Sequence, residues 1–268
     1  MAKQAIVTLA IGADYAERFE RYCRANWSVY ANRHRFDLVV ITEPLDTSER
    51  ARRRSPAWQK CLILGAPQVA GYDRVVWVDS DICINPAAPS ILDGVPPERI
   101  GAVDEHSFPS HDARQAILDV ILAAAPETGD FDKRFWEAWR SPGAWHAFMG
   151  LPSGQSHIVQ SGVIVLSPEH HRELLEHVYH AYEDAGSRPL DRAPGWGEMG
   201  PLSHEIQARG LEHWIDPRFN ALIWWLFLHQ NASPDELPRF VQENYRRSYF
   251  LHFAGCAHLM PLVVTAGA

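Results

Sequence analysis

The sequence predicts an α/β protein with a single Rossmann-type, doubly wound and mostly parallel sheet flanked by helices. Charge-free apolar runs alternate along the chain with segments of helical periodicity, as they do in such sheets. The run from Val75 to Val78 is apolar at every position, which is typical of a strand buried on both faces. A length of 268 residues suits one large domain with a substantial core.

Each element is predicted from its local pattern. Asp14 opens the first helix, and Glu17 stands where the acid of a capping box would be. The buried stripe of this helix is expected to hold Tyr15, Phe19, Tyr22, Cys23 and Trp27. Strands are expected at residues 5–11, 36–41, 75–78, 100–103 and 157–166. Further helices are expected at residues 56–69, 112–125, 168–184 and 201–208, with an irregular excursion at 126–155 and a loop at 186–200.

Composition limits the classes of function. A formal charge of -8 argues against bulk nucleic-acid binding, because such binding requires a net basic surface. The four cysteines are scattered without a C-x-x-C pair, which favours buried thiols in a reducing compartment. No apolar stretch reaches the length of a membrane span and the start lacks a signal-peptide pattern, so we expect a cytoplasmic protein without an integral membrane segment.

One basic cluster interrupts this acidic chain. Arg50, Arg52, Arg53 and Arg54 lie within five residues of one another. A solvated loop or helix face is the simpler interpretation, and contact with an anionic acceptor or a donor phosphate is the alternative.

The most informative stretch is Asp79-Ser80-Asp81, directly after the buried run. Carboxylates at i and i+2 can converge on one hard divalent cation, and the carboxyl end of a strand is where open α/β sheets bind ligands. D-x-D alone is unspecific, since it arises by chance about once in a chain of this length. A second copy, Asp130-Phe131-Asp132, follows a glycine and precedes a helical pattern, so we interpret its acids as helix caps.

A histidine near the end of the chain is a candidate third ligand. His252 follows the apolar residues Tyr249-Phe250-Leu251, and a neutral imidazole is a good ligand for manganese. A lone histidine in an apolar strand is more often packed in the core, and the pattern alone leaves both interpretations open.

Taken in order, several motifs resemble those of GT-A glycosyltransferases, particularly the retaining galactosyltransferase and glycogenin-like branches. They span nearly the whole chain and are residues 6–10 (IVTLA), 58–60 (WQK), 76–81 (VWVDSD), 160–163 (QSGV), 218–220 (RFN) and 252–256 (HFAGC). The resemblance implies that Asp79, Asp81 and His252 share a divalent metal, Mn²⁺ or Mg²⁺, bound to the diphosphate of a UDP-sugar. Such a dication would stabilise the charge that develops as the diphosphate leaves.

The resemblance also implies residues that contact the donor. Thr8 and Ala10 would lie against the uracil and ribose, and Lys60 would contact the donor, although a strand residue and a surface lysine are the alternatives. Ser161 and Gly162 lie where the family has a tight turn beside the sugar, and Gly162 could equally permit a strand bulge. Further donor contacts are expected from Ser80 and Gly255. Asp104 and Glu105, just beyond a strand end, are weaker candidates for contacts with sugar hydroxyls.

Two residues are expected at the reacting sugar, and two positions depart from the family pattern. Gln160 or Glu198 would support the positive charge that grows at the anomeric carbon, and a surface glutamate that precedes a helix is the alternative interpretation of Glu198. Glu198 stands where these enzymes carry an acid followed by glutamine, but Met199 replaces that amide here. His258 stands where the glycogenin-like pattern has a lysine, so only a protonated imidazole could supply that charge.

The other histidines are interpreted as structural or surface residues. His170, His171, His177 and His180 share one predicted helix and are placed on or near its solvated side. The sequence contains no H-E-x-x-H, G-x-S-x-G, Walker or G-x-G-x-x-G motif, which argues against zinc peptidase, serine hydrolase, P-loop and dinucleotide-binding functions.

We therefore expect a metal-dependent transferase that moves a sugar from a UDP-sugar to a carbohydrate or other hydroxyl acceptor, with retention implied by the resemblance. Residues 1–105 would form the nucleotide-binding half and residues 106–268 the acceptor half of a single domain. A nucleotide-sugar hydrolase or phosphoryl-transfer enzyme, and a non-catalytic nucleotide-sugar-binding protein, are the alternatives.

Overall fold

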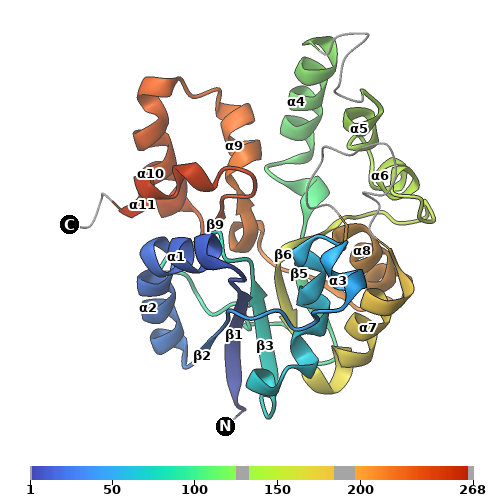
Figure 1. Ribbon diagram of the computed structural model, residues 1–268. Helices are drawn as coiled ribbons and strands as arrows, with labels where there is room; N and C mark the ends of the chain where they lie inside the picture. The colour runs from blue at the N-terminus through green and yellow to red at the C-terminus, as the bar shows by residue number, and fades with distance from the viewer. Residues whose placement is uncertain (1, 125–132, 184–196, 265–268) are drawn as a thin grey trace.

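The computed structural model describes residues 2–124, 133–183 and 197–264, and its centre is a six-stranded sheet of order β2-β1-β3-β6-β5-β7 (Figure 1). Five strands run in one direction, because only β6 is antiparallel to its neighbours β3 and β5. The expected mostly parallel sheet is confirmed. Its strands are β1 (Gln4–Leu9), β2 (Asp37–Ile41), β3 (Arg74–Val78), β5 (Ile100–Asp104), β6 (Val159–Leu166) and β7 (Glu212–Trp214).

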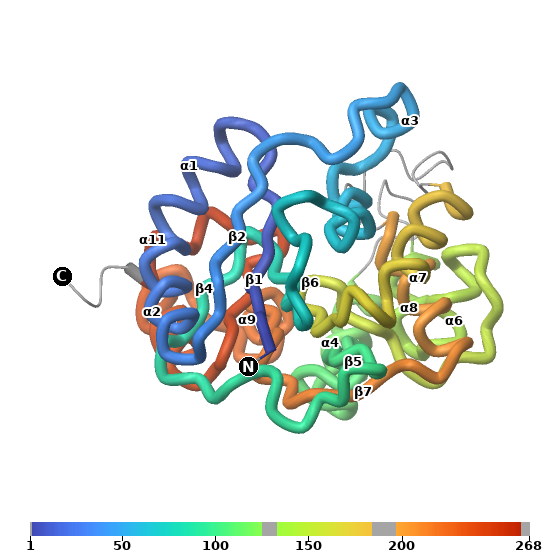
Figure 2. The backbone as a smooth tube through the Cα atoms, turned by 90° about the horizontal axis from the view of Figure 1, so that it is seen from below, coloured from blue at the N-terminus to red at the C-terminus, as the bar shows by residue number. Residues whose placement is uncertain are grey.

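Both faces of this sheet are covered, which explains the continuous apolar run in β3. Successive side chains of a strand point to opposite faces. Val76 and Val78 pack in one hydrophobic cluster with Trp27, whereas Val75 and Trp77 pack in the other. Figure 2 shows α1 and α2 on one side of the sheet and α7 and α8 on the other. These helices are α1 (Ala13–Tyr22), α2 (Arg24–His34), α7 (Pro168–Ala181) and α8 (Met199–Ala208).

A second, three-stranded sheet of order β4-β9-β8 was not predicted from the sequence. It consists of β4 (Ile82–Ile84), β8 (Ala221–Leu222) and β9 (Phe250–His252). β9 is antiparallel to β4, with His252 opposite Ile82, and parallel to β8. This pairing fastens the C-terminal part of the chain beside the loop that follows β3.

Helices on either side of the sheet's carboxyl edge complete the molecule (Figure 1). One group is α9 (Ile223–Gln230), α10 (Leu237–Arg247) and α11 (Pro261–Val264), and the other is α4 (His111–Ala124), α5 (Lys133–Ala138) and α6 (Pro142–Phe148). The short elements are α3 (Glu49–Arg52), η1 (Pro56–Gly65), η2 (Pro67–Val69), η3 (Glu105–Ser107), η5 (Pro217–Asn220), η6 (Pro234–Glu236) and η7 (Ala257–Leu259). The expected helix at 56–69 is thus two 3₁₀ segments. Among the described residues, no helix combines the length and apolarity that crossing a membrane requires.

Several local predictions need correction or lie outside the described residues. The first helix begins at Ala13 after Gly12 and is interrupted at Cys23, so Asp14 is not its N-cap. Tyr15 is 52% exposed and does not join the buried stripe, although Phe19 and Trp27 do. The acids of the second D-x-D copy, Asp130 and Asp132, lie outside the described residues, as does most of the predicted loop at 186–200.

Helix α7 differs from the prediction at one histidine. His170, His177 and His180 are exposed, but His171 is fully buried. Its Nδ1 accepts a hydrogen bond of 2.9 Å from the backbone N–H of Ser167, the N-cap residue. Burial lowers the pKa of His171 from 6.5 to about 4, because the charged imidazole would lose its hydration.

This shift predicts a pH-dependent stability. Between pH 6.5 and 4 the His171 imidazole is protonated in the unfolded chain but stays neutral in the folded protein. The free energy of unfolding therefore falls as the pH falls through that window. Relative to His171→Gln, which cannot be protonated, the native protein should lose about 3 kcal/mol more of unfolding free energy. Urea unfolding at a series of pH values measures this difference, with His170→Gln as the exposed control. If the unfolding free energies of the native protein and His171→Gln change equally with pH, the lowered pKa of His171 is contradicted.

Candidate functional site

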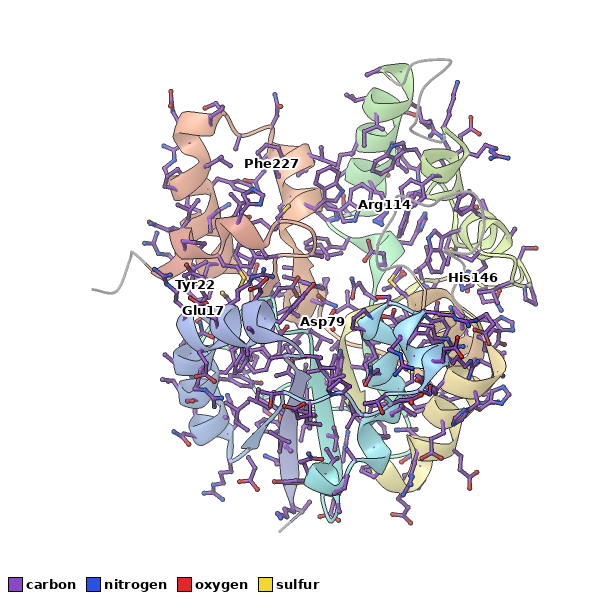
Figure 3. The ribbon with its side chains drawn as sticks, viewed as in Figure 1. Glu17, Tyr22, Asp79, Arg114, His146 and Phe227 are labelled. Atoms are coloured by element: carbon purple, nitrogen blue, oxygen red, sulfur yellow. The ribbon has the colours of Figure 1, made fainter. Side chains whose placement is uncertain are left out.

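Asp79 is held rigidly at the carboxyl end of β3, where it lies at the upper edge of the sheet in Figure 3. Its backbone N–H donates to the carbonyl of Gly162 on the neighbouring strand, at 2.8 Å. Its Oδ1 accepts hydrogen bonds from Lys60 Nζ at 3.1 Å and from Trp77 Nε1 at 2.9 Å. These two donors leave Oδ2 for another partner.

The small sheet brings His252 to the two aspartates. Pairing of β4 with β9 sets His252 opposite Ile82, the residue after Asp81. His252 Nε2 lies 3.2 Å from Asp81 Oδ1 and 3.8 Å from Asp79 Oδ2. One ligand atom from each of the three residues lies within 4.8 Å of the others. The histidine is buried, whereas the aspartate side chains are about a quarter exposed, at 26% and 25%.

This donor set fits a divalent cation. Two carboxylate oxygens and one imidazole nitrogen suit manganese, and the exposed side of the aspartates leaves room for further oxygen ligands. Next to them lies Glu198, whose Oε1 is 2.9 Å from Lys60 Nζ and accepts a hydrogen bond from Ser161 Oγ at 2.9 Å. With His252 neutral, as a metal ligand must be, three carboxylates against one ammonium leave two negative charges in excess, which a dication would neutralise.

The pKa values follow from this crowding. Burial raises the pKa of Asp79, and the charges of Lys60 and His252 offset it only in part. Burial acts in the same direction on Asp81, but the His252 imidazole outweighs it and lowers the pKa of that carboxyl. Burial disfavours a charged His252, yet the two aspartates more than compensate and raise its pKa above 6.5. The pKa of Lys60 is raised, because Asp79 and Glu198 outweigh the effect of burial.

Gly162 makes room for the imidazole of His252. A Cβ at this position would lie 2.4 Å from His252 Cε1 and 2.7 Å from its Nδ1, closer than real side chains approach. The pairing of β5 with β6 also shifts here, from Ala102 opposite Ile164 to Val103 opposite Gln160. The pairing of β6 with β5 is therefore irregular around Gly162, and the glycine accommodates a protein side chain.

Gln160 is tied to the same histidine through Asn220. Gln160 Oε1 accepts hydrogen bonds from the backbone N–H of Gly162 and from Asn220 Nδ2, the latter at 2.8 Å. Asn220 Oδ1 lies 2.9 Å from His252 Nδ1. The motif at residues 218–220 predicts no role for Asn220, because the neighbouring residues in the sequence do not indicate that its partners are Gln160 and His252.

The other residues expected to contact the donor are not hydrogen-bonded, within the described part of the chain, to the two aspartates and the histidine of the cluster. Thr8 and Ala10 are fully buried, and Thr8 Oγ1 has no hydrogen-bond partner among the described residues. Ser80 is half-buried beside the aspartates, and Gly255 and His258 are exposed. Gly255 adopts a φ of 69°, which favours glycine.

Asp104 and Glu105 are both occupied by protein partners. Both oxygens of Asp104 accept hydrogen bonds, and one of them pairs with His157 Nδ1 at 2.9 Å. Glu105 Oε1 pairs with Arg114 Nη2 at 2.9 Å and accepts from Trp225 Nε1 at 2.8 Å. Asp104 thus organises the loop after β5, and Glu105 anchors α4 to α9.

The arginine cluster has a structural role. Arg54 is buried, its guanidinium stacks on Trp58 at 4.4 Å, and it donates to the carbonyls of Tyr179 and Tyr182. Arg50 donates to the carbonyls of His180 and Tyr182 at 3.0 Å each. Two of the four arginines therefore cap the C-terminus of α7.

Of three comparisons with known proteins, the comparison with solved structures finds proteins of similar fold. No family model and no curated protein matches the sequence. Among solved structures, a glycosyltransferase involved in the glycosylation of the major capsid of PBCV-1 is 15% identical, with 97% of this chain and 100% of that chain covered and a TM-score of 0.53. The galactosyltransferase LgtC, in complex with donor and acceptor sugar analogs, is 12% identical over 98% of this chain and 96% of that chain, with a TM-score of 0.49. The capsid enzyme confirms the glycosyltransferase fold that the resemblance implies.

The site geometry predicts that Gly162 cannot be replaced by alanine without displacing His252. Overpacking in a rigid core should cost about 1–3 kcal/mol of unfolding free energy. The displaced imidazole should also weaken manganese binding. Gly154→Ala is the control, because a Cβ there meets nothing within 4 Å. Urea unfolding and manganese titration measure both effects, and a Gly162→Ala protein indistinguishable from Gly154→Ala would refute the packing argument.

Proposed function

We propose that this protein is a metal-dependent glycosyltransferase that moves a sugar from a UDP-sugar to a hydroxyl acceptor with retention of configuration. The observation that carries the proposal is the convergence of Asp79, Asp81 and His252 at the carboxyl end of β3 within a glycosyltransferase fold. Ligands bind at this edge in open α/β sheets. The net negative charge of the cluster favours a cation, and a bound cation in turn favours a diphosphate.

In this proposal Asp79 Oδ2, Asp81 Oδ1 and His252 Nε2 hold a manganese or magnesium ion. When bound, the ion supplies positive charge to the departing diphosphate. Lys60 keeps Asp79 and Glu198 together, because its ammonium lies 3.1 Å and 2.9 Å from their oxygens. Without that lysine the buried carboxylate of Glu198 and the partly exposed carboxylate of Asp79 would repel each other across the donor site.

Two polar groups are available for the sugar. Glu198 Oε2 is buried and has no hydrogen-bond partner among the described residues, so a sugar hydroxyl would satisfy it. The hydrogen bonds of Gln160 among the described residues engage its carbonyl oxygen, which leaves the amide N–H groups to donate to a hydroxyl. Met199 begins α8 and is buried, so it offers no amide where the resemblance places one.

Retention follows in this proposal from the leaving group. Asp79 Oδ1 is occupied by Lys60 and Trp77, and Glu198 Oε1 by Lys60 and Ser161. Because Glu198 Oε2 is assigned to a sugar hydroxyl and Asp79 Oδ2 to the cation, the departing phosphate is proposed as the base that takes the acceptor proton, on the face from which it leaves. The acceptor attacks that same face, so the configuration at the anomeric carbon is kept.

Asp81→Asn tests the site directly. The variant should lose manganese-dependent stabilisation by UDP in a thermal-shift assay, because one anionic ligand is missing. Sugar transfer should fall roughly 10²-fold or more. Asp37→Asn removes the same charge at the start of β2, the opposite edge of the sheet, and should behave as the native protein. Unchanged metal dependence in Asp81→Asn would eliminate the assignment.

Donor turnover separates the alternatives. A transferase should release sugar from UDP-sugar slowly until an acceptor hydroxyl is supplied. Release of free sugar at full rate from the donor alone would identify a hydrolase. Binding of UDP and manganese without turnover against a panel of hydroxyl acceptors would identify a non-catalytic binding protein.

A further inference from the structure

A short chain of hydrogen bonds lies behind the metal-binding cluster. The backbone N–H of Gly162 donates to Gln160 Oε1, which also accepts from Asn220 Nδ2 at 2.8 Å. Asn220 Oδ1 lies 2.9 Å from His252 Nδ1. All three side chains are buried: Asn220 is fully buried, His252 is 3% exposed and Gln160 is 7% exposed.

The direction of every hydrogen bond in this chain is fixed by its first member. A backbone N–H can only donate, so the Gln160 atom facing Gly162 must be the carbonyl oxygen. That oxygen can only accept, so Asn220 turns its NH₂ toward it and its own oxygen toward the histidine. An amide oxygen cannot donate, and His252 Nδ1 must therefore carry a hydrogen. The lone pair of the neutral ring is then on Nε2, the atom nearest Asp81 and Asp79.

Hydrogen bonding disfavours the flipped orientation of the His252 ring. Its Cε1 and Nδ1 lie 2.4 Å and 2.7 Å from where a Cβ on Gly162 would be, so this ring edge is packed against the backbone of β6. Turning the ring over would place a C–H group against Asn220 Oδ1 and leave a buried oxygen without a donor. An unsatisfied buried acceptor costs about 1–3 kcal/mol.

We propose that Asn220 is a positioning residue for the metal centre, which fixes His252 in the Nδ1–H tautomer and thereby presents Nε2 to the cation. Partners of this kind on metal-binding histidines orient the ring and select its tautomer. The same amide turns the NH₂ of Gln160 away from Asn220, and among the described residues this NH₂ makes no hydrogen bond. This inference rests on the metal site in the proposed function, but the tautomer of His252 is a property of the metal-free protein.

An asparagine suits this position because it both donates and accepts. Asn220→Asp keeps an acceptor for His252 Nδ1–H but loses the donor to Gln160. Asn220→Leu has a similar volume and offers neither. Both variants fill the space of Asn220, so a difference between them reports the loss of the acceptor for His252 Nδ1–H rather than a change in packing.

The experiment measures tautomer and metal affinity. Two-bond ¹⁵N–¹H correlations of the histidine rings, recorded on metal-free protein at alkaline pH where the ring is neutral, distinguish Nδ1–H from Nε2–H. Titration with manganese, followed by the electron paramagnetic resonance signal of the free ion, gives the affinity. The control is Asn244→Leu, since Asn244 is an equally buried asparagine that bonds Phe240 and Gln230 on the helical side of the molecule.

We expect Nδ1–H in the native protein and in Asn220→Asp, with manganese affinities within a few-fold of each other. Asn220→Leu should lose the single tautomer and bind manganese about 10–100-fold more weakly, whereas Asn244→Leu should not change either readout. Native affinity in Asn220→Leu, or Nε2–H in the native protein, would overturn the inference. If Asn220→Leu does not fold, the native tautomer and the affinity of Asn220→Asp still decide it. A native Nδ1–H ring in a protein that binds no manganese would instead overturn the metal site of the proposed function and the positioning role with it, while the assignment of the His252 tautomer to Asn220 would stand.

Discussion

Three carboxylates confined to one edge of a sheet are the constraint on which this structure depends. Asp79, Asp81 and Glu198 repel one another in this partly buried site, and among the described residues the ammonium of Lys60 lies between Asp79 and Glu198. Burying charges is tolerated when they are paired or when they coordinate a metal. The arrangement of these side chains therefore fits a dication, and the pairing of β4 with β9 brings His252 beside the two aspartates.

The main sheet and its ligand edge could be predicted from sequence because they depend on local patterns. The unbroken apolar run of β3 requires cover on both faces, and this places Asp79 and Asp81 at a ligand-binding edge. The second sheet could not be predicted in this way. Its strands have three, two and three residues, too short for a periodicity to be recognised. The pairing of β4 with β9 joins segments far apart in the chain, so only the resemblance, and no local pattern, placed His252 at the metal.

Side-chain roles were harder to predict than positions. Gln160 was expected to face the sugar, but its carbonyl oxygen is engaged by Gly162 and Asn220, and only its NH₂ group is left for a ligand. Asp104 was expected to contact the donor, whereas hydrogen bonds within the protein occupy both of its oxygens. His171 was placed near solvent from its helix, and a tertiary contact buries it. In each case the partner comes from another element, which composition and spacing do not reveal.

The central claim is that one dication is held jointly by two aspartates and a histidine. An anomalous-difference map from crystals grown with manganese and UDP tests it most directly. The account predicts a single strong peak about 2 Å from Asp79 Oδ2, Asp81 Oδ1 and His252 Nε2, with the diphosphate on its exposed side. Manganese bound elsewhere, or a diphosphate bound with no metal touching these three atoms, would contradict it.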